Sequence, residues 1–226
     1  MKLLAALILS IGIALAGYFV EHGITQHTQF NRYVSVKGLA EKTVKSDRAV
    51  WQLNVTYSAN DLNALYAGIA EAQNAVSAFW LAQGFAVSDI TLQPININDN
   101  TTYNNTHGAH YTAFSTLILS SSDVDRISAA SQNMNTLVQK NILLNASTIT
   151  YSFTQLNAIK PAMLDDATHN AEAAAQAFAK NSHSHLNGIR TASQGQFTIS
   201  DDNNSGMSSI NKHVRVVTTV DYFLKK

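Results

Sequence analysis

Residues 51–57 alternate strictly between apolar and polar side chains, and this pattern constrains the fold more than any other feature of the chain. The apolar positions are Trp51, Leu53, Val55 and Tyr57. Successive side chains of a β-strand point to opposite faces, so the segment predicts a strand with one buried and one solvated face. Strands of this kind are typical of antiparallel sheets. The chain should therefore contain an antiparallel sheet with one face packed on a core.

The other periodic segments give the order ββαββαβαββ. Besides the alternating segment, strands are expected near 33–44, 90–97, 111–120, 148–153, 188–200 and 214–224. Helices are expected over 61–83 and 123–140, and a third should carry Pro161 in its first turn, where proline is favoured. Pro94 places its strand at a sheet edge or at a bulge. The predicted fold is α+β, with a mainly antiparallel sheet packed by about three helices and preceded by an N-terminal membrane helix.

The third helix carries small residues along one side. This side consists of Ala167, Ala171, Ala174, Ala175 and Phe178. Because alanine side chains are small, the stripe predicts that this helix packs unusually close to a sheet or to another helix.

The N-terminal segment is the main indication of cellular location. Residues 3–20 form an uncharged, mostly apolar run of 18 residues, which as a helix would extend about 27 Å and nearly span a bilayer. We expect a signal anchor over 1–20, a tether over 21–31 and a folded domain over 32–226. Lys2 should keep the N-terminus cytoplasmic. Cleavage after Ala16 would instead release a free periplasmic protein.

Composition excludes several classes of function. The formal net charge is +0 and the charged fraction is 13%, so nothing favours binding to a nucleic acid. The absence of cysteine excludes thiolate catalysis, disulfides and Cys-based metal sites.

Several segments together resemble the SIMPL-domain family. Arg32–Trp51 (RYVSVKGLAEKTVKSDRAVW) is similar to the opening hairpin of these proteins. The segments DVDRISAASQ (123–132) and Tyr151–Ala179 resemble helical regions, and Ile189–Ile199 and Val214–Leu224 resemble the closing strands. These segments lie in the family's order across most of residues 32–226.

The resemblance implies a bacterial envelope protein without established enzymatic chemistry. It implies an inner-membrane or periplasmic location, a role in envelope integrity or stress tolerance, and homo-oligomers that are ring-like in at least one relative. It supplies no catalytic motif to transfer, so we expect a non-enzymatic protein with no cofactor.

Four histidines are the best metal-binding candidates, although solvated imidazoles are the simpler interpretation. They are His107, His110, His183 and His185. Imidazole binds zinc or copper only when several ligands converge on the ion. In a glycine-containing loop, the two side chains of a His-x-x-His pair are not held in a fixed relative orientation, as they would be on a helix.

The remaining motifs give little support to catalysis. The chain has neither a G-x-S-x-G elbow nor a glycine-rich nucleotide loop, and Ser120–Ser122 is interpreted as a strand end that leads into a helix cap. The alternative to a self-assembling envelope protein is a periplasmic module that binds a ligand or metal through the polar loops 99–110 and 201–212.

Overall fold

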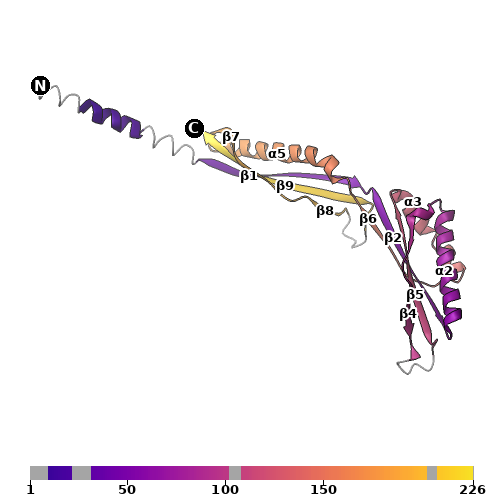
Figure 1. The fold of residues 1–226 in the computed structure, drawn as a ribbon. Coiled ribbons are helices and arrows are strands. Elements are labelled where there is room, and N and C mark those ends of the chain that lie inside the picture. Colours follow the sequence, from indigo (N-terminus) through magenta and orange to yellow (C-terminus); the bar gives the residue numbers. More distant parts are fainter. Residues whose placement is uncertain (1–9, 22–31, 102–107, 203–207, 226) are drawn as a thin grey trace. The chain divides into compact units, whose positions relative to one another are not determined.

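The chain divides into two compact units, each built on an antiparallel sheet. The computed structural model describes residues 10–21, 32–101, 108–202 and 208–225 (Figure 1). Unit 1 comprises Met1–Lys42, Asn157–Ile199 and Val214–Lys226, and unit 2 comprises Thr43–Leu156 and Ser200–His213. The predicted α+β class with antiparallel pairing is confirmed, and the strands are divided between two sheets.

The sheet of unit 2 is organised around the alternating segment. It lies in β2 (Arg48–Ala59), which pairs with β5 (Tyr111–Ser121) on one side and β6 (Leu144–Ser152) on the other. β3 (Ile90–Leu92) and β4 (Asn96–Asp99) both pair with the far side of β5. The expected strand over 90–97 is therefore interrupted around Pro94, at an edge of the sheet.

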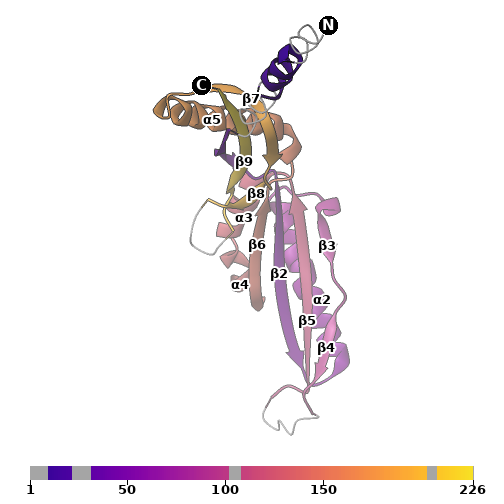
Figure 2. The same ribbon diagram turned by 90° about the vertical axis from the view of Figure 1, so that its left-hand side faces the viewer.

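Helices cover one face of this sheet (Figure 2). They are α2 (Leu62–Ala82), α3 (Val124–Gln132) and α4 (Asn135–Gln139). Trp51 is fully buried in an edge-to-face arrangement with Phe79 and Trp80, at centroid distances of 6.2 and 5.6 Å. The Trp51 Nε1–H donates to Ser147 Oγ at 3.0 Å, so this side chain connects β2 to both α2 and β6.

Two details of unit 2 differ from the sequence prediction. Tyr57, near the end of the strand, is 41% exposed, although its ring lies against Gly68 of α2. The helix expected over 123–140 is two helices, since the first one ends at Asn133, whose backbone N–H donates to the Ala130 carbonyl oxygen.

The sheet of unit 1 has β9 (Asn211–Lys225) at its centre. β1 (Tyr33–Lys45) lies on one side of it, and β7 (His185–Gln194) and β8 (Thr198–Asp201) lie on the other. The expected strand over 188–200 is thus two strands, with Gly195 between them. A Cβ on Gly195 would overlap the carbonyl oxygen of Val217, so the chain passes β9 too closely there for another residue.

The third helix begins before Pro161, which corrects the predicted start. α5 spans Leu156–Asn181, and Pro161 lies inside it. The carboxylate of Asp47 accepts hydrogen bonds from the backbone N–H groups of Thr154 and Gln155, at 2.9 and 3.1 Å. A negative charge there stabilises a helix N-terminus. The stabilising group is remote in sequence, so local pattern could not reveal it.

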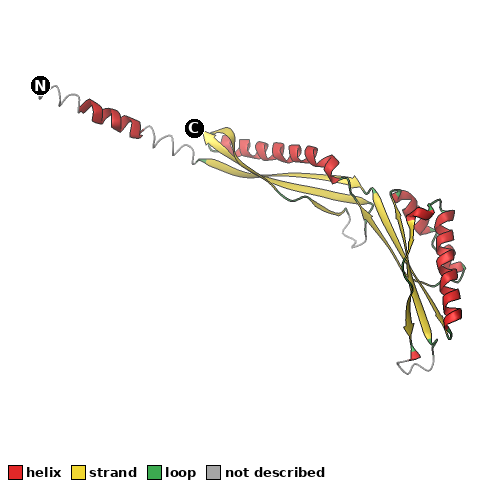
Figure 3. Cartoon of the chain, in the orientation of Figure 1, coloured by secondary structure: helices red, strands yellow, loops and turns green. Residues whose placement is uncertain are grey.

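α5 lies along the sheet of unit 1 (Figure 3), and its alanine stripe is buried, as predicted. The buried positions recur every fourth residue and are Met163, Ala167, Ala171, Ala175 and Ala179. A Cβ on Gly38 of β1 would overlap the Ala167 carbonyl oxygen and lie 2.6 Å from the Ala171 nitrogen, so helix and strand backbones are nearly in contact.

Phe178 does not belong to this buried side, contrary to the prediction, and is 59% exposed. A four-residue spacing advances about 40° around a helix at each step. The buried row therefore turns around the axis, and at its C-terminal end Phe178 lies about 100° from Ala179.

The N-terminal apolar segment is described only from residue 10. Residues 10–21 form a helix with exposed side chains, whereas residues 3–9 of the expected anchor and nearly all of the expected tether lie outside the described residues. Within the described ranges, no helix has both the length and the apolarity that a membrane crossing requires.

Replacement of Gly38 tests the contact between α5 and β1. We expect Gly38→Ala to lower the free energy of unfolding by about 2–3 kcal/mol, because overpacking forces the two backbones apart. Lys37→Ala, at an exposed neighbouring position, is the matched control and should change it by less than about 0.5 kcal/mol. Urea denaturation followed by circular dichroism measures both, and equal values would contradict the close packing.

Candidate functional site

Three of the four candidate histidines lie among the described residues, and none of them belongs to a metal-binding cluster there. His107 lies outside the described residues, and His110 precedes β5 in unit 2, where its backbone N–H donates to Asn60 Oδ1 at 3.2 Å. His183 and His185 belong to unit 1. Among the described residues, no group of three or more His, Cys, Asp or Glu side chains is placed to hold a metal ion.

The two polar loops lie at opposite ends of β2. His110, at the end of loop 99–110, is bonded to Asn60, just beyond the C-terminal end of the strand. In loop 201–212, the Ile210 carbonyl oxygen accepts from the Ser46 N–H at the other end. A strand of this length extends about 40 Å, at about 3.3 Å per residue. The described ends of the two loops therefore do not meet at a common site.

Loop 201–212 is held on unit 2 by hydrogen bonds from its described residues. Ser208 Oγ accepts from the Tyr151 backbone N–H at 2.9 Å, in addition to the bond between Ile210 and Ser46. An ion pair between Lys212 and Asp201 closes the loop. The side chain of Lys212 is 8% exposed and that of Asp201 is 38% exposed, so the lysine depends more on its partner. This part of the loop has a structural role.

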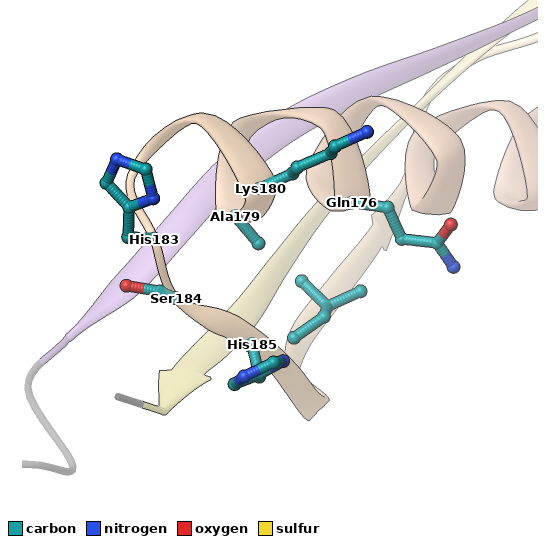
Figure 4. A pocket seen from close by; sticks show the side chains of 7 residues that line it. Gln176, Ala179, Lys180, His183, Ser184 and His185 are labelled. Carbon is teal, nitrogen blue, oxygen red and sulfur yellow. The ribbon is translucent and has the colours of Figure 1, made fainter.

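A groove between α5 and β7 is a candidate site. Two adjoining cavities of about 500 and 400 Å³ share Gln176 and Leu186, and they form what we call the α5–β7 groove (Figure 4). One wall is a row of α5 side chains spaced by four residues, and β7 with Tyr222 of β9 provides the rest. The α5 row is Thr168, Glu172, Gln176 and Lys180.

The groove exists because the buried stripe of α5 packs against β1 and β9. Val36, Ala171, Ala175, Val220 and Tyr222 form the small core of unit 1. The wall row lies about 100° around the helix from that stripe, since each wall residue follows a buried alanine by one position. β7 therefore receives little cover, and Ile189 is 53% exposed.

The groove has a polar rim with weak electrostatic features. Burial, and to a lesser extent the carboxylate of Glu172, raises the pKa of the Tyr222 hydroxyl above its usual value. His183, in the turn that follows α5, has φ of 52°, and Ser184 follows as a buried residue whose hydroxyl donates to the Ser182 carbonyl oxygen at 3.3 Å. Figure 4 shows the imidazoles of His183 and His185 on different sides of this turn. The geometry suits ligand contact better than nucleophilic catalysis.

A second, polar cavity of about 400 Å³ surrounds the three consecutive serines. Its lining residues are Asp47, Arg48, Asp89, Ser120, Ser121, Ser122 and Thr154. Ser121 Oγ accepts from the Asp123 N–H at 3.1 Å, and Asp123 Oδ1 accepts from the Arg126 N–H at 3.0 Å. The serines thus end β5 and lead into the cap of α3, which confirms their predicted structural role.

The sequence analysis missed the α5–β7 groove. The signal that could have revealed its wall is the four-residue spacing of Thr168, Glu172, Gln176 and Lys180, next to the alanine stripe. The opposite side, formed by β7 and Tyr222 of β9, was not recognisable. It depends on the pairing of β7 with β9, which joins segments separated by β8 and loop 201–212.

Comparison with known proteins identifies one family. The sequence model of the SIMPL family, described as a protein of unknown function, matches residues 34–219. No curated protein matches the chain. The match covers strands and helices of both units, so the family's pattern extends across most of the described fold.

The ion pair in loop 201–212 should be asymmetric in its contribution to stability. Asp201→Ala leaves the buried ammonium of Lys212 without a counter-charge and should cost about 3 kcal/mol. Lys212→Met leaves a carboxylate that water can reach and should cost about 1 kcal/mol or less. The double variant should be more stable than Asp201→Ala alone. Chemical denaturation measures all three, and equal losses in the single variants would refute the asymmetry.

The same carboxylate should make stability depend on pH. Hydrogen bonds from the Lys212 side chain and the Ser209 backbone hold the pKa of Asp201 below its usual 3.8. The contribution is therefore complete above the unfolded-state pKa and is lost as the pH falls through the lower folded-state pKa. We expect the difference in Tm between wild type and Asp201→Asn to be constant above about pH 5 and to shrink below pH 3.8. A difference independent of pH would contradict this assignment.

Proposed function

Because the chain belongs to the SIMPL family, we propose that it is a non-enzymatic envelope protein that assembles with copies of itself. Residues 3–20 would hold it in the bacterial inner membrane, with both folded units in the periplasm and a role in envelope integrity or stress tolerance. The family description states no activity, so the proposal rests on features of this chain.

The N-terminal sequence supports the membrane part of the proposal. Residues 3–20 carry no charged side chain, and residues 10–21 adopt a helix with exposed side chains. An exposed apolar helix in water is unfavourable, and insertion into a bilayer removes that apolar surface. Lys2 favours retention of the N-terminus in the cytoplasm.

The free edge of strand β6 is the main observation that supports self-assembly. Its only described strand pairing is with β2, and the Tyr151 N–H near its end donates to Ser208 Oγ. The rest of its outer edge has no strand partner among the described residues of unit 2. The sequence LNASTITYS contains neither a charged residue nor a proline. Proteins commonly protect free edges with such residues, and an unprotected edge can pair with another chain.

Other surfaces are less suited to repeated contacts between copies. The alanine stripe of α5 is already buried inside unit 1, so it cannot provide the interface that its small residues suggest. β7 carries irregularities in its pairing between Asn187 and Thr191, and bulges of this kind hinder edge-to-edge association. The described ends of the two polar loops lie at opposite ends of β2, which favours self-assembly over a shared ligand site.

Light scattering of the full chain in detergent tests self-assembly. We expect a particle of several copies, and Asn145→Lys on β6 should shift it toward the monomer, because a charge at the edge opposes pairing. Asn74→Lys, on the exposed side of α2, adds the same charge and should leave the particle unchanged. A monomeric wild type would refute self-assembly. Mass measurement of the mature chain tests the anchor separately, since loss of residues 1–16 would show a free periplasmic protein.

A further inference from the structure

The face of the unit 2 sheet turned away from α2 carries only uncharged side chains between Val50 and Ser58 and at the paired positions of the neighbouring strands. We call it the hydroxyl–amide face. Its central polar members are Gln52, Asn54, Thr56, Thr112, Thr116 and Thr148. No described helix of unit 2 covers this face, which is turned toward the viewer in Figure 2.

The side chains of this face are held in a regular array. Thr116 Oγ1 donates to Asn54 Oδ1 at 2.6 Å, and the hydroxyls of Ser58 and Thr112 are 3.0 Å apart. Side chains on one face repeat about every 7 Å along a strand and about every 4.8 Å across strands. Threonine is restricted at χ1, so a ligand would immobilise few freely rotating groups on binding.

The lack of charge is specific to this face. The corresponding open face of the unit 1 sheet, turned away from α5, carries an ion pair between Arg215 and Glu41 at 3.4 Å. It also carries Asp221, which accepts a hydrogen bond from Thr191 at 2.6 Å. Solvated protein surfaces usually intersperse charges of both signs. The hydroxyl–amide face departs from that pattern over several strands.

We propose that the hydroxyl–amide face binds an uncharged glycan strand. The face offers no counter-charge, so an ionic ligand would lose hydration without compensation. Hydroxyl and amide groups both donate and accept hydrogen bonds, as do the hydroxyl and acetamido groups of a sugar. Phe114 and Ile118, both half-buried in the centre of the array, provide apolar surface for the C–H groups of the sugar rings.

A second copy of the chain fits this face less well. The buried centre of a stable protein interface is about 65% apolar, whereas Val50, Phe114 and Ile118 are separated here by threonine, asparagine and glutamine. The edge of β6 proposed for self-assembly is a different feature, so either proposal can fail without the other.

Co-sedimentation with chitin and with cellulose tests the proposal. The full chain is kept in a polyoxyethylene detergent, which has no sugar headgroup. We expect wild type to sediment with at least one polymer, with the bound fraction unchanged in about 1 M NaCl because no charge pairs are involved. Gln52→Lys, in the middle of the face, should weaken binding about tenfold. Asn74→Lys on α2 is the control with equal charge and should bind as wild type does.

A second variant removes one hydroxyl and adds no charge. Thr148 is exposed on β6, so Thr148→Val should leave folding intact, as shown by unchanged fluorescence of Trp51 and Trp80, and weaken binding severalfold. Three results would overturn the proposal: no sedimentation with either polymer, equal binding of Gln52→Lys and Asn74→Lys, or binding abolished by salt. Loss of concentration-dependent self-association in Gln52→Lys, without glycan binding, would assign the face to contact between copies.

Discussion

Each unit packs helices against only one face of its sheet, and this one-sided burial determines most other features of the protein. The core must lie in a single layer between sheet and helix, so the central strands β2, β5 and β9 alternate between buried and more exposed side chains. In unit 2 the layer is filled by large residues around Trp51. In unit 1 the helix side of the layer consists mostly of alanine, and α5 lies almost directly on β1 at Gly38. Small side chains give less hydrophobic stabilisation but allow extensive backbone contact.

One-sided burial also leaves each sheet with an open face, and the two faces differ in chemistry. The open face of unit 1 has paired charges of the kind found on ordinary solvated surfaces, including Arg215 with Glu41. The open face of unit 2 replaces charges with hydroxyl and amide groups. Its edge strand β6 is also uncharged, so unit 2 concentrates the surfaces that lack the usual protection against association. The assembly and glycan proposals both follow from this difference, through separate parts of the sheet.

The features that could be predicted from sequence were those set by local periodicity. Alternation around Trp51 gave the strand and its buried face, and the spacing of Ala167, Ala171 and Ala175 gave close helix packing. Features that depend on remote residues were missed. The start of α5 is stabilised by Asp47, and the β7 side of the α5–β7 groove needs β7 beside β9. The candidate histidines form no metal cluster among the described residues, and residue type alone does not specify convergence in space.

The central position of β9 has a consequence for the order of folding. The sheet of unit 2 is assembled from strands that end at Ser152, whereas the sheet of unit 1 places its last strand between β1 and β7. A chain that emerges from its N-terminus, on a ribosome or through a translocation channel, can pair the unit 2 strands early. β1 must wait for β9, with roughly 170 residues of chain between them, and such long-range pairing is intrinsically slow. During that interval β1 and the apolar side of α5 remain uncovered. Unit 1 should therefore expose the apolar surface that a chaperone binds.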